Sequence, residues 1–383
     1  MTSNSGLSLY FHIPFCASKC HYCDFYSKSK SEDYLDRYLD ALLIEWIQVS
    51  KKMNLSSRKI RTIYFGGGTP SLLSPRQFTD FCSKLKNSLD LADNLEWTVE
   101  CNPDSFSGEK AESFLKQGVN RLSFGIQSLN NRELKVLGRR HTAEKSREVL
   151  STSVLSGFHS VGADLMFGIP LQTKQSFEKS LMEVLSSPYV KHLSLYELTI
   201  NENTPFGRHQ RKLPLPDDDL IGEMAELSLE TARSRGFEHY EVSNYSRPSF
   251  RSCHNETYWD HQDYIGLGAS AHSYIHPLRW SNVSDTATYI DNCFSGKATS
   301  DFSETIDGVK LAHEILFLGL RRQSGINEEL YRQKTGKTFY CSATKTKLDL
   351  FLKDGFLIHE YPWWRPTDKG MLFADTLARN LID

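Results

Sequence analysis

Residues 10 to 25 read YFHIPFCASKCHYCDF, and three cysteines stand close together within this stretch. Cys16, Cys20 and Cys23 follow an apolar segment, Leu7–Ile13, which predicts a β-strand that ends just before the cysteines. Three thiolates on one loop can bind a metal centre, and a fourth would complete a tetrahedral zinc site or a fully ligated iron–sulfur cluster. No fourth cysteine follows nearby. A cluster of four irons held by three cysteines would leave one iron open to a small molecule.

Two other interpretations of these cysteines stay open. Zinc could be held by the three thiolates and a distant fourth ligand such as His21, or the thiols could be purely structural. The spacing C-x3-C-x2-C directly after a strand, with Tyr22 just before the last cysteine, nevertheless resembles the signature of radical S-adenosylmethionine (SAM) proteins. That resemblance implies an open iron that binds the amino and carboxylate groups of SAM.

The composition predicts a soluble globular protein. The chain has 383 residues, 39% of them hydrophobic, and a formal net charge of −2. Such a charge gives no general attraction to nucleic acid or to an anionic membrane. No apolar run reaches membrane-spanning length and the N-terminus lacks a signal pattern, so we expect a cytoplasmic location, with membrane contact only through a partner. Four further cysteines are expected to be small buried hydrophobic residues: Cys82, Cys101, Cys293 and Cys341.

Strand-like and helix-like stretches alternate through the first 240 residues. The predicted strands are Leu7–Ile13, Thr62–Phe65, Glu96–Glu100, Arg121–Gly125, Val161–Phe167 and His192–Leu198. The predicted helices are Glu32–Val49, one that starts at Ser74-Pro75, Glu109–Lys116, Ala143–Ser156, Gln175–Ser186 and Asp218–Arg235. This alternation predicts an α/β fold with a parallel sheet and right-handed crossovers. A partial (β/α)6 barrel fits better than an open sheet, because polar signals fall at successive strand ends.

The composition changes after residue 240. Residues 241–304 are rich in Tyr, Trp, His, Asn and Gly, and we expect a connecting segment there. Residues 305–383 predict a small helical unit with a β-hairpin, which resembles a winged helix. Its predicted elements are helices at Val309–Leu320, Asn327–Gly336, Ser342–Gly355 and Gly370–Leu381, and strands at Phe356–His359 and Arg365–Asp368. The chain is thus expected to have three parts, with a barrel domain over residues 1–240.

Polar residues follow the predicted strands at their carboxyl ends. Glycines at 66–68 let the backbone approach a ligand and expose carbonyls that can accept from an ammonium group. Carboxylates suit an amine or ribose hydroxyls, and arginine suits a carboxylate. The residues at these ends are Glu100, Gln127, Arg139 and Asp164, with Arg140 as a competitor of Arg139. Each alone is equally typical of a solvated surface residue, but together they predict a ligand site at the mouth of the barrel.

Seven segments together resemble the oxygen-independent coproporphyrinogen III oxidase family of radical SAM proteins. They are YFHIPFCASKCHYCDF, YFGGGTPSLL, VECNPD, LSFGIQS, LGRRHTAEK, ADLMFGIPLQT and YIGLGASAHS. The resemblance extends from Tyr10 through the C-terminal unit, and the choice of a barrel depends on it as much as on the pattern. It implies a 4Fe–4S cluster on the three cysteines and one or two SAM molecules. The residues that it places around SAM are Tyr10, Tyr22, Gly67, Gly68, Thr69, Glu100, Gln127, Arg139, Asp164, Leu198 and His272, the last two differing in identity from the family.

Two features resemble the heme chaperone branch of this family: CDF after the third cysteine, and CHNETYW at Cys253–Trp259. This branch implies heme as a cargo that is passed to apo-hemoproteins, with respiratory ones expected, and a homodimer is left open. Imidazole or thiolate can ligate heme iron, and aromatic rings pack on a porphyrin. The candidate heme residues are therefore Cys253, His254, Asn255, Tyr258 and Trp259, with His272 as a second imidazole. In the alternative interpretation, His254 and Asn255 hydrogen-bond inside a buried loop, and Tyr258 and Trp259 belong to the core.

Two departures from the family argue against oxidase activity. The oxidase has a further cysteine two residues beyond its third cluster ligand, where this chain has Phe25. It also has a long N-terminal extension, whereas nine residues precede Tyr10 here. We therefore expect a heme chaperone. The alternatives are an oxygen-independent coproporphyrinogen III oxidase, which decarboxylates porphyrinogen propionates by radical SAM chemistry, and another radical SAM enzyme that acts on a porphyrin. No nucleic-acid partner is expected, since Asp349 and Asp354 interrupt the lysines of the winged-helix-like unit.

Overall fold

A 12-stranded sheet runs through the described part of the chain, residues 6–24 and 32–382 of this computed structural model. Its strands lie in the order β12-β11-β10-β9-β1-β2-β3-β4-β5-β6-β8-β7. Their bounds are β1 (Leu7–Ile13), β2 (Ile60–Gly67), β3 (Leu91–Cys101), β4 (Arg121–Gln127), β5 (Ser160–Phe167), β6 (Val190–Glu197), β7 (Glu238–Glu241), β8 (Asn244–Ser246), β9 (Tyr264–Leu267), β10 (His272–Ile275), β11 (Leu278–Asn282) and β12 (Ser300–Thr305). β1 to β6 pair in parallel in chain order, and β9 pairs in parallel with the other side of β1.

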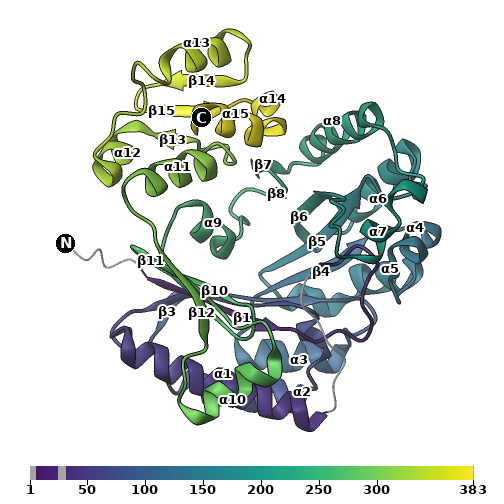
Figure 1. Cartoon of the computed structure of the whole chain (residues 1–383). Coiled ribbons are helices and arrows are strands. Elements are labelled where there is room, and N and C mark those ends of the chain that lie inside the picture. The colour runs from purple at the N-terminus through teal and green to yellow at the C-terminus, as the bar shows by residue number, and fades with distance from the viewer. Residues whose placement is uncertain (1–5, 25–31, 383) are drawn as a thin grey trace.

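Helices connect the parallel strands, and most of them cover the convex face of the sheet (Figure 1). They are α1 (Glu32–Lys52), α2 (Pro75–Lys86), α3 (Gly108–Gln117), α4 (Asn131–Leu137), α5 (Ala143–Ser151), α6 (Lys174–Leu185), α7 (Pro205–Arg208) and α8 (Asp218–Ser234). All the predicted strands of the barrel are present, and the predicted α/β partial barrel is confirmed. The sequence does not predict α4, because seven residues contain too little of the helical period.

Side chains alternate between the two faces of the central strands, as the pleat of a β-strand requires. On β1, Phe11 is fully buried on the convex face, where its ring packs edge-on against Phe81 of α2 at a centroid distance of 5.5 Å. The neighbouring Tyr10 points to the concave face, where its ring stacks on Tyr64 of β2 at 6.0 Å. The convex face therefore carries the apolar core, and polar side chains gather on the concave face.

Local signals place several helix ends where the sequence predicts them. The Ser74 side chain accepts a hydrogen bond from the backbone N–H of Gln77, and Pro75 occupies the first turn of α2. Gly118 ends α3 in the left-handed conformation, with φ of 93°. The helix predicted over Ala143–Ser156 is shorter, because Thr152 is extended and a 3-10 turn at Ser153–Gly157 follows.

Residues 241–304, in which the sequence predicts a connecting segment, contribute strands to the same sheet. β8 pairs with β6 at one end, and β9 to β12 extend the sheet beyond β1 at the other. The segment also contains α9 (Cys253–Trp259) and α10 (Thr286–Ser295). The strands are short and mostly antiparallel, so their sequence pattern is weak. The boundaries of the three parts stay a prediction.

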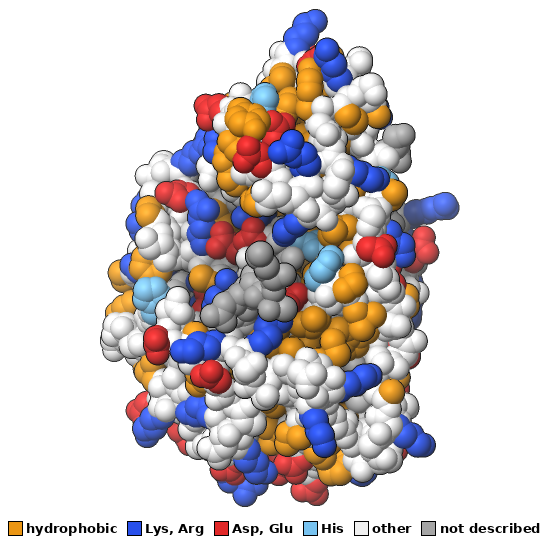
Figure 2. Space-filling view, turned by 90° about the vertical axis from the view of Figure 1, so that its left-hand side faces the viewer, with side chains coloured by type: hydrophobic (Ala, Val, Ile, Leu, Met, Phe, Trp, Pro, Cys, Tyr) orange, Lys and Arg blue, Asp and Glu red, His pale blue; other side chains and the backbone are white. Residues whose placement is uncertain are grey.

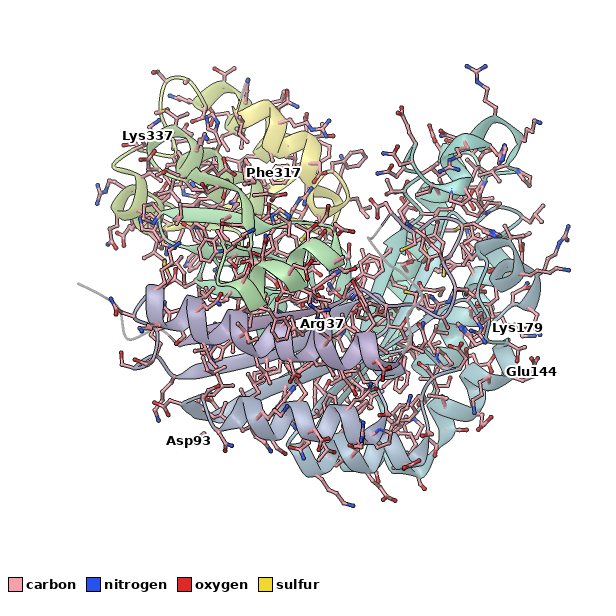
Figure 3. The ribbon with its side chains drawn as sticks, turned by 60° about the horizontal axis from the view of Figure 1, so that its bottom comes forward. Arg37, Asp93, Glu144, Lys179, Phe317 and Lys337 are labelled. Atoms are coloured by element: carbon pink, nitrogen blue, oxygen red, sulfur yellow. The ribbon has the colours of Figure 1, made fainter. Side chains whose placement is uncertain are left out.

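The C-terminal residues form a smaller body with its own core. It comprises α11 (Gly308–Gly319), β13 (Ile326–Asn327), α12 (Glu328–Thr335), α13 (Lys345–Lys353), β14 (Leu357–Glu360), β15 (Trp363–Pro366), α14 (Asp368–Leu372) and α15 (Ala374–Ile382). Its strands pair in the order β13-β15-β14, and Trp364 is buried among Leu316, Leu320 and Leu377. Figure 3 shows Phe317 and Lys337 in this body, apart from Asp93 and Lys179 at the margins of the barrel. The expected C-terminal helical domain is confirmed.

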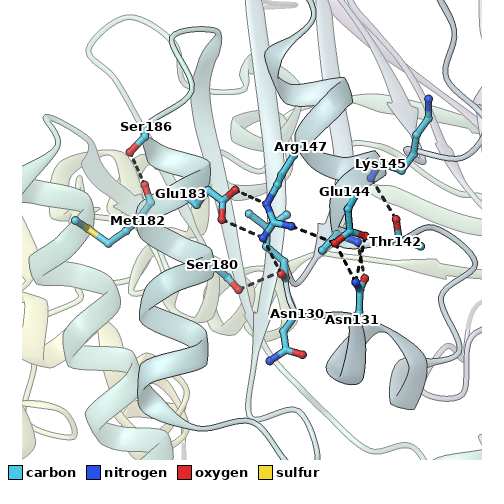
Figure 4. A network of polar contacts seen from close by, with 12 residues as sticks. Asn130, Asn131, Thr142, Glu144, Lys145, Arg147, Ser180, Met182, Glu183 and Ser186 are labelled. Atoms are coloured by element: carbon cyan, nitrogen blue, oxygen red, sulfur yellow. Dashed lines mark hydrogen bonds and ion pairs between the residues drawn. The ribbon is translucent and has the colours of Figure 1, made fainter.

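Arg147 of α5 braces the helices outside the barrel (Figure 4). Its Nε donates to Oε1 of Glu183 on α6 at 2.5 Å, and its Nη2 donates to Oε2 at 3.1 Å. Nη2 also donates to the carbonyl of Leu129 at 3.1 Å. Because ion pairs in contact with solvent contribute only about 0–1 kcal/mol, this pair positions the helices more than it stabilises the fold.

The surface carries charges of both signs. Figure 2 shows Lys and Arg side chains interspersed with Asp and Glu over the face that it presents. No helix within residues 6–24 and 32–382 combines the length and the apolar character needed to cross a membrane.

Glu45 of α1 ties the added strands to the barrel. Its buried carboxylate accepts hydrogen bonds from the backbone N–H of Gly268 at 2.9 Å, from Nδ2 of Asn282 at 2.6 Å, from the hydroxyl of Tyr289 at 2.5 Å and from that of Thr299 at 3.1 Å. Burial raises the pKa of this carboxyl to about 7, against the opposing effect of these donors.

We predict that Glu45→Ala lowers the free energy of unfolding by about 3 kcal/mol or more, because each buried donor left without an acceptor costs about 1–3 kcal/mol. Urea denaturation measures this difference. Glu148→Ala is the control, since Glu148 is 68% exposed and pairs with Lys145 on the surface of α5; it should change stability by about 0.5 kcal/mol or less. Equal effects of the two substitutions would show that the Glu45 network does not hold the strands.

Candidate functional site

A cavity of about 410 Å³ opens at the carboxyl ends of the parallel strands. Its lining comes from the cysteine loop after β1, from the carboxyl ends of β2 to β6, and from loops that follow these strands, which are far apart in the sequence. The lining contains the three clustered cysteines and most of the residues that the family resemblance places around SAM: Cys16, Cys20, Cys23, Tyr22, Gly67, Gly68, Thr69, Glu100, Gln127, Arg139 and Asp164. The fold thus brings one predicted set of residues to one place.

The cysteine loop follows β1 and lies against the glycine-rich loop that follows β2. A Cβ atom at Gly68 would lie 2.7 Å from the carbonyl oxygen and 2.8 Å from the nitrogen of Phe15, so only glycine permits this contact. Two thiols have donors beside them: the hydroxyl of Thr69 lies 3.6 Å from Sγ of Cys16, and Nη1 of Arg139 lies 3.7 Å from Sγ of Cys20. Both contacts place a hydrogen-bond donor beside a sulfur that the family resemblance assigns to the cluster.

The geometry bears on the zinc alternative. Within the part of the chain that the structure describes, no three His, Cys, Asp or Glu side chains come together around one point where a single metal ion could bind. His21, the distant ligand considered for zinc, forms a 2.8 Å hydrogen bond through Nδ1 to the carbonyl of Val136 and packs on Phe206. His21 is thus engaged elsewhere, and the three cysteines share one loop.

Glu100 fixes the glycine-rich loop from the opposite wall. Its Oε2 accepts from the backbone N–H of Gly67 at 3.0 Å, and its Oε1 accepts from the hydroxyl of Tyr64 at 2.8 Å. Gly67 has φ of 109°, a conformation that other residues rarely adopt. Burial raises the pKa of Glu100 to about 7. Glu100 lines the cavity, and with this pKa its carboxyl changes charge near neutral pH.

The wall formed by β4 and β5 carries Arg139 and Asp164. Nη2 of Arg139 donates to Oδ1 of Asn102 and to the carbonyl of Gly125, both at 2.6 Å. Asp164 accepts from the hydroxyl of Ser123 at 3.1 Å, and burial raises its pKa to about 6. Arg140, which the sequence could not distinguish from Arg139, is 57% exposed in its side chain and faces an aspartate at 3.9 Å. Arg139 is the one that contacts a cysteine.

Three residues of the predicted SAM set lie outside this lining. Tyr10 makes a 3.0 Å hydrogen bond between its hydroxyl and Nδ1 of His12. Leu198 is buried among apolar side chains that include Met166 and Phe206. His272 is exposed on β10. Their role at the site stays a prediction.

Among the lining residues that the sequence did not predict are Asn102 and Tyr196. Asn102 donates through Nδ2 to the hydroxyl of Thr69 at 3.1 Å and accepts from Arg139, so it connects two loops. Asn102 stands in the VECNPD segment, two residues after Glu100, so its place just after a strand was a signal in the sequence for a site residue. Tyr196 is the penultimate residue of β6 and lines the cavity from that strand. A tyrosine inside a strand resembles any core aromatic residue, so no sequence signal could have identified it.

The HN-x2-YW motif, which comprises His254, Asn255, Tyr258 and Trp259, belongs to α9. His254 is 1% exposed, and both of its ring nitrogens are engaged: Nδ1 lies 2.7 Å from the hydroxyl of Thr62 and Nε2 lies 2.8 Å from that of Tyr258. Burial lowers the pKa of His254 to about 3, so the ring is neutral. His254 thus has the contacts expected in the buried hydrogen-bonding interpretation, whereas Asn255, Tyr258 and Trp259 are half-buried. The role of the motif in heme binding stays a prediction. Cys253, at the start of α9, is exposed.

Comparisons with known proteins agree with this geometry. Residues 10–184 match the family model described as the radical SAM superfamily, and residues 309–373 match the HemN C-terminal domain. A solved structure of coproporphyrinogen III oxidase (HemN) from Escherichia coli, described as a radical SAM enzyme, aligns with a TM-score of 0.84. It is 21% identical and the alignment covers 98% of this chain and 90% of that one, which shows a shared fold.

Curated relatives define the family more closely. Heme chaperone HemW of Lactococcus lactis subsp. lactis is 34% identical over 380 residues, which cover 98% of this chain and 97% of the relative. Heme chaperone HemW of Escherichia coli is 32% identical over 375 residues, with 97% of each chain covered. The radical SAM family implies a 4Fe–4S cluster and SAM, which suit the three cysteines and the polar cavity. The chain therefore belongs to the radical SAM superfamily and, within it, to the HemW family of heme chaperones.

Proposed function

We propose that this protein is a heme chaperone that carries a 4Fe–4S cluster, binds SAM, and delivers heme to apo-hemoproteins. The observation that carries the proposal is the identity of 30% or more to HemW proteins over nearly the whole chain. We further propose a cytoplasmic location, and respiratory hemoproteins as recipients of the heme.

The oxidase alternative has less support. It depends on the fold that the chain shares with HemN at 21% identity, and a fold hosts more than one function. Phe25, which stands where the oxidase has a further cysteine, lies outside the described residues. Both functions use the same cluster and SAM site, so the cavity alone does not distinguish them.

The cavity suggests a role for each group of residues. Cys16, Cys20 and Cys23 would hold the cluster, which when bound supplies an open iron for the amino and carboxylate groups of SAM. The loop at 66–68 and Glu100 would accept hydrogen bonds from the amino group, because carbonyl and carboxylate oxygens line that wall. Asp164 would accept from ribose hydroxyls, as carboxylates at strand ends do in other nucleoside sites.

The cluster ligands can be tested by substitution. We predict that Cys16→Ala, reconstituted anaerobically, retains much less iron and sulfide than the unsubstituted protein, because one thiolate ligand is missing. Cys82→Ala is the matched control, since Cys82 is a buried thiol of α2 in the apolar core. Chemical analysis of iron and sulfide measures the outcome. Full iron and sulfide in Cys16→Ala would contradict the assignment.

The pKa of Glu100 leads to a pH dependence. At about pH 8 the carboxyl is ionised and accepts from the amino group of SAM, whereas at about pH 6 it is mostly protonated. We predict that Glu100→Gln weakens SAM binding more at about pH 8 than at about pH 6. The ratio of the variant's Kd for SAM to that of the unsubstituted protein should be up to tenfold larger at the higher pH. Comparing the variant with the unsubstituted protein at each pH cancels the titration of SAM itself. Equal ratios would show that Glu100 does not titrate against SAM.

The function is tested by heme transfer and by the oxidase assay on the same preparation. We predict that protein holding its cluster and SAM binds heme stoichiometrically and releases it to an apo-globin acceptor, as absorption spectra of the acceptor would show. We also predict no decarboxylated product from coproporphyrinogen III with SAM and a reductant, followed by mass spectrometry. Product above the level of the Cys16→Ala control would overturn the chaperone proposal in favour of the oxidase.

A further inference from the structure

The helix that contains the HN-x2-YW motif lies inside the curve of the sheet. Figure 1 shows α9 on the concave side, between the barrel and the C-terminal body. Three neighbouring strands hold it there through side chains of one row: in the sheet register, Ser8 of β1 pairs with Thr62 of β2, and Thr62 with Glu96 of β3. This row lies two residues below the row of Tyr10, Tyr64 and Thr98.

Each residue of that row contacts α9. The hydroxyl of Ser8 lies 2.9 Å from that of Thr257, and the hydroxyl of Thr62 lies 2.7 Å from Nδ1 of His254. Glu96 accepts from the backbone N–H of Cys253 at 3.0 Å and from that of His254 at 2.8 Å. The first turn of α9 therefore caps a polar row, and the helix closes the barrel at the end opposite the cavity.

Contacts continue from α9 to the cavity without a gap. The ring of His254 stacks on that of Tyr64, with a centroid distance of 4.8 Å and an interplanar angle of 25°. Tyr64 donates from its hydroxyl to Glu100 at 2.8 Å, and Glu100 accepts from the backbone N–H of Gly67 at 3.0 Å. One side of Tyr64 thus contacts the HN-x2-YW motif, and its hydroxyl orients a carboxylate that lines the cavity.

We propose that α9 supports the SAM cavity from beneath through Tyr64, without lining it, and that His254 is a positioning residue for SAM. Its ring holds Tyr64 in place, and the hydroxyl of Tyr64 orients Glu100 against the glycine-rich loop. This inference depends on the proposed function, because it takes the cavity as the SAM site. It assigns to the motif a role in SAM binding that is separate from any ligation of heme iron.

The arrangement also couples the two ligands. A heme that took His254 as its axial ligand would break the hydrogen bonds of the imidazole with Thr62 and Tyr258 and remove its stack on Tyr64. Glu100 would then lose the group that orients it, so the bound heme would weaken SAM binding. By linkage, SAM would weaken heme binding through His254 by the same factor.

SAM affinity of the cluster-loaded protein tests the inference, measured anaerobically by calorimetry and by the change that SAM causes in the EPR spectrum of the reduced cluster. We expect His254→Ala and Tyr64→Phe each to weaken SAM binding by roughly tenfold, the usual effect of losing one buried hydrogen bond to a carboxylate. His254→Phe keeps a ring against Tyr64 and should restore affinity to within about threefold of the unsubstituted protein. A residue needed only for folding would not show this rescue.

Glu256→Gln is the matched control. Glu256 lies on α9 with its carboxylate 3.9 Å from Nη1 of Arg251, and its side chain takes no part in the contacts with Ser8, Thr62, Glu96 or Tyr64 described above, so SAM affinity should be unchanged. Tyr64→Phe removes a single oxygen atom and keeps the test valid if His254→Ala does not fold. If Tyr64→Phe and His254→Ala both keep full cluster content and unchanged SAM affinity, the inference about His254 is overturned, but the proposed function is not. Unsubstituted protein that holds its cluster but binds no SAM would overturn the proposed function as well.

Discussion

Polar side chains buried on the concave face of the sheet must find hydrogen-bond partners, and much of the structure follows from this requirement. The period of the strands puts Phe11 and its neighbours on the convex face and Tyr10, Thr62 and Glu96 on the other. No apolar element could cover that second face without leaving hydroxyls and a carboxylate unpaired. Helix α9 covers its lower end with backbone N–H groups and an imidazole, and the upper end stays open as the cavity.

The two glutamates of β3 show how one strand serves both ends. Glu96 accepts from the first backbone N–H groups of α9, which have no partner within the helix. Glu100 lies two rows higher on the same face of β3, lines the cavity, and accepts from the N–H of Gly67 and the hydroxyl of Tyr64. The chain itself therefore supplies the donors at the lower carboxylate, and a ligand with an amino group is suited to the upper one. A carboxylate of β3 that accepts from N–H groups thus both attaches α9 and helps to form the binding site.

Local signals explain what the sequence could predict. The spacing of the cysteines, the glycines after β2 and the cap at Ser74 depend on residues next to one another in the chain, and the structure has each where it was expected. Contacts between distant residues could not be predicted in this way. A pattern of alternating residues assigns a face to Thr62, but it does not say that His254, 192 positions later, will meet it. For the same reason the partners of Tyr64 were missed.

Side-chain direction at a loop is a further limit. Arg139 and Arg140 are neighbours with the same chemistry, and only the turn after α4 decides that Arg139 points to Cys20. The strands β9 to β12 were missed because strands of four to six residues give too weak an alternating pattern. Asn102 could have been noticed from its place beside Glu100, but its function as a link between Thr69 and Arg139 depends on three loops that only the fold brings together.

The HN-x2-YW motif faces two places at once, and this limits how it can bind heme. His254 and Tyr258 point into the barrel, whereas Trp259 lines a second cavity with Trp363 and Arg322 of the C-terminal body. That cavity has a volume of about 140 Å³, below the roughly 300–1,000 Å³ of ordinary small-molecule pockets. A heme held by this motif must therefore displace side chains on one side of α9. On the barrel side it must replace two hydrogen bonds of a buried imidazole, whose partners would each cost about 1–3 kcal/mol if left unpaired. On the other side it must separate α9 and the residues after it from the C-terminal body, where Asp260 pairs with Arg322 and His261 with Glu314. That route leaves the contacts of His254 with Thr62, Tyr64 and Tyr258 in place.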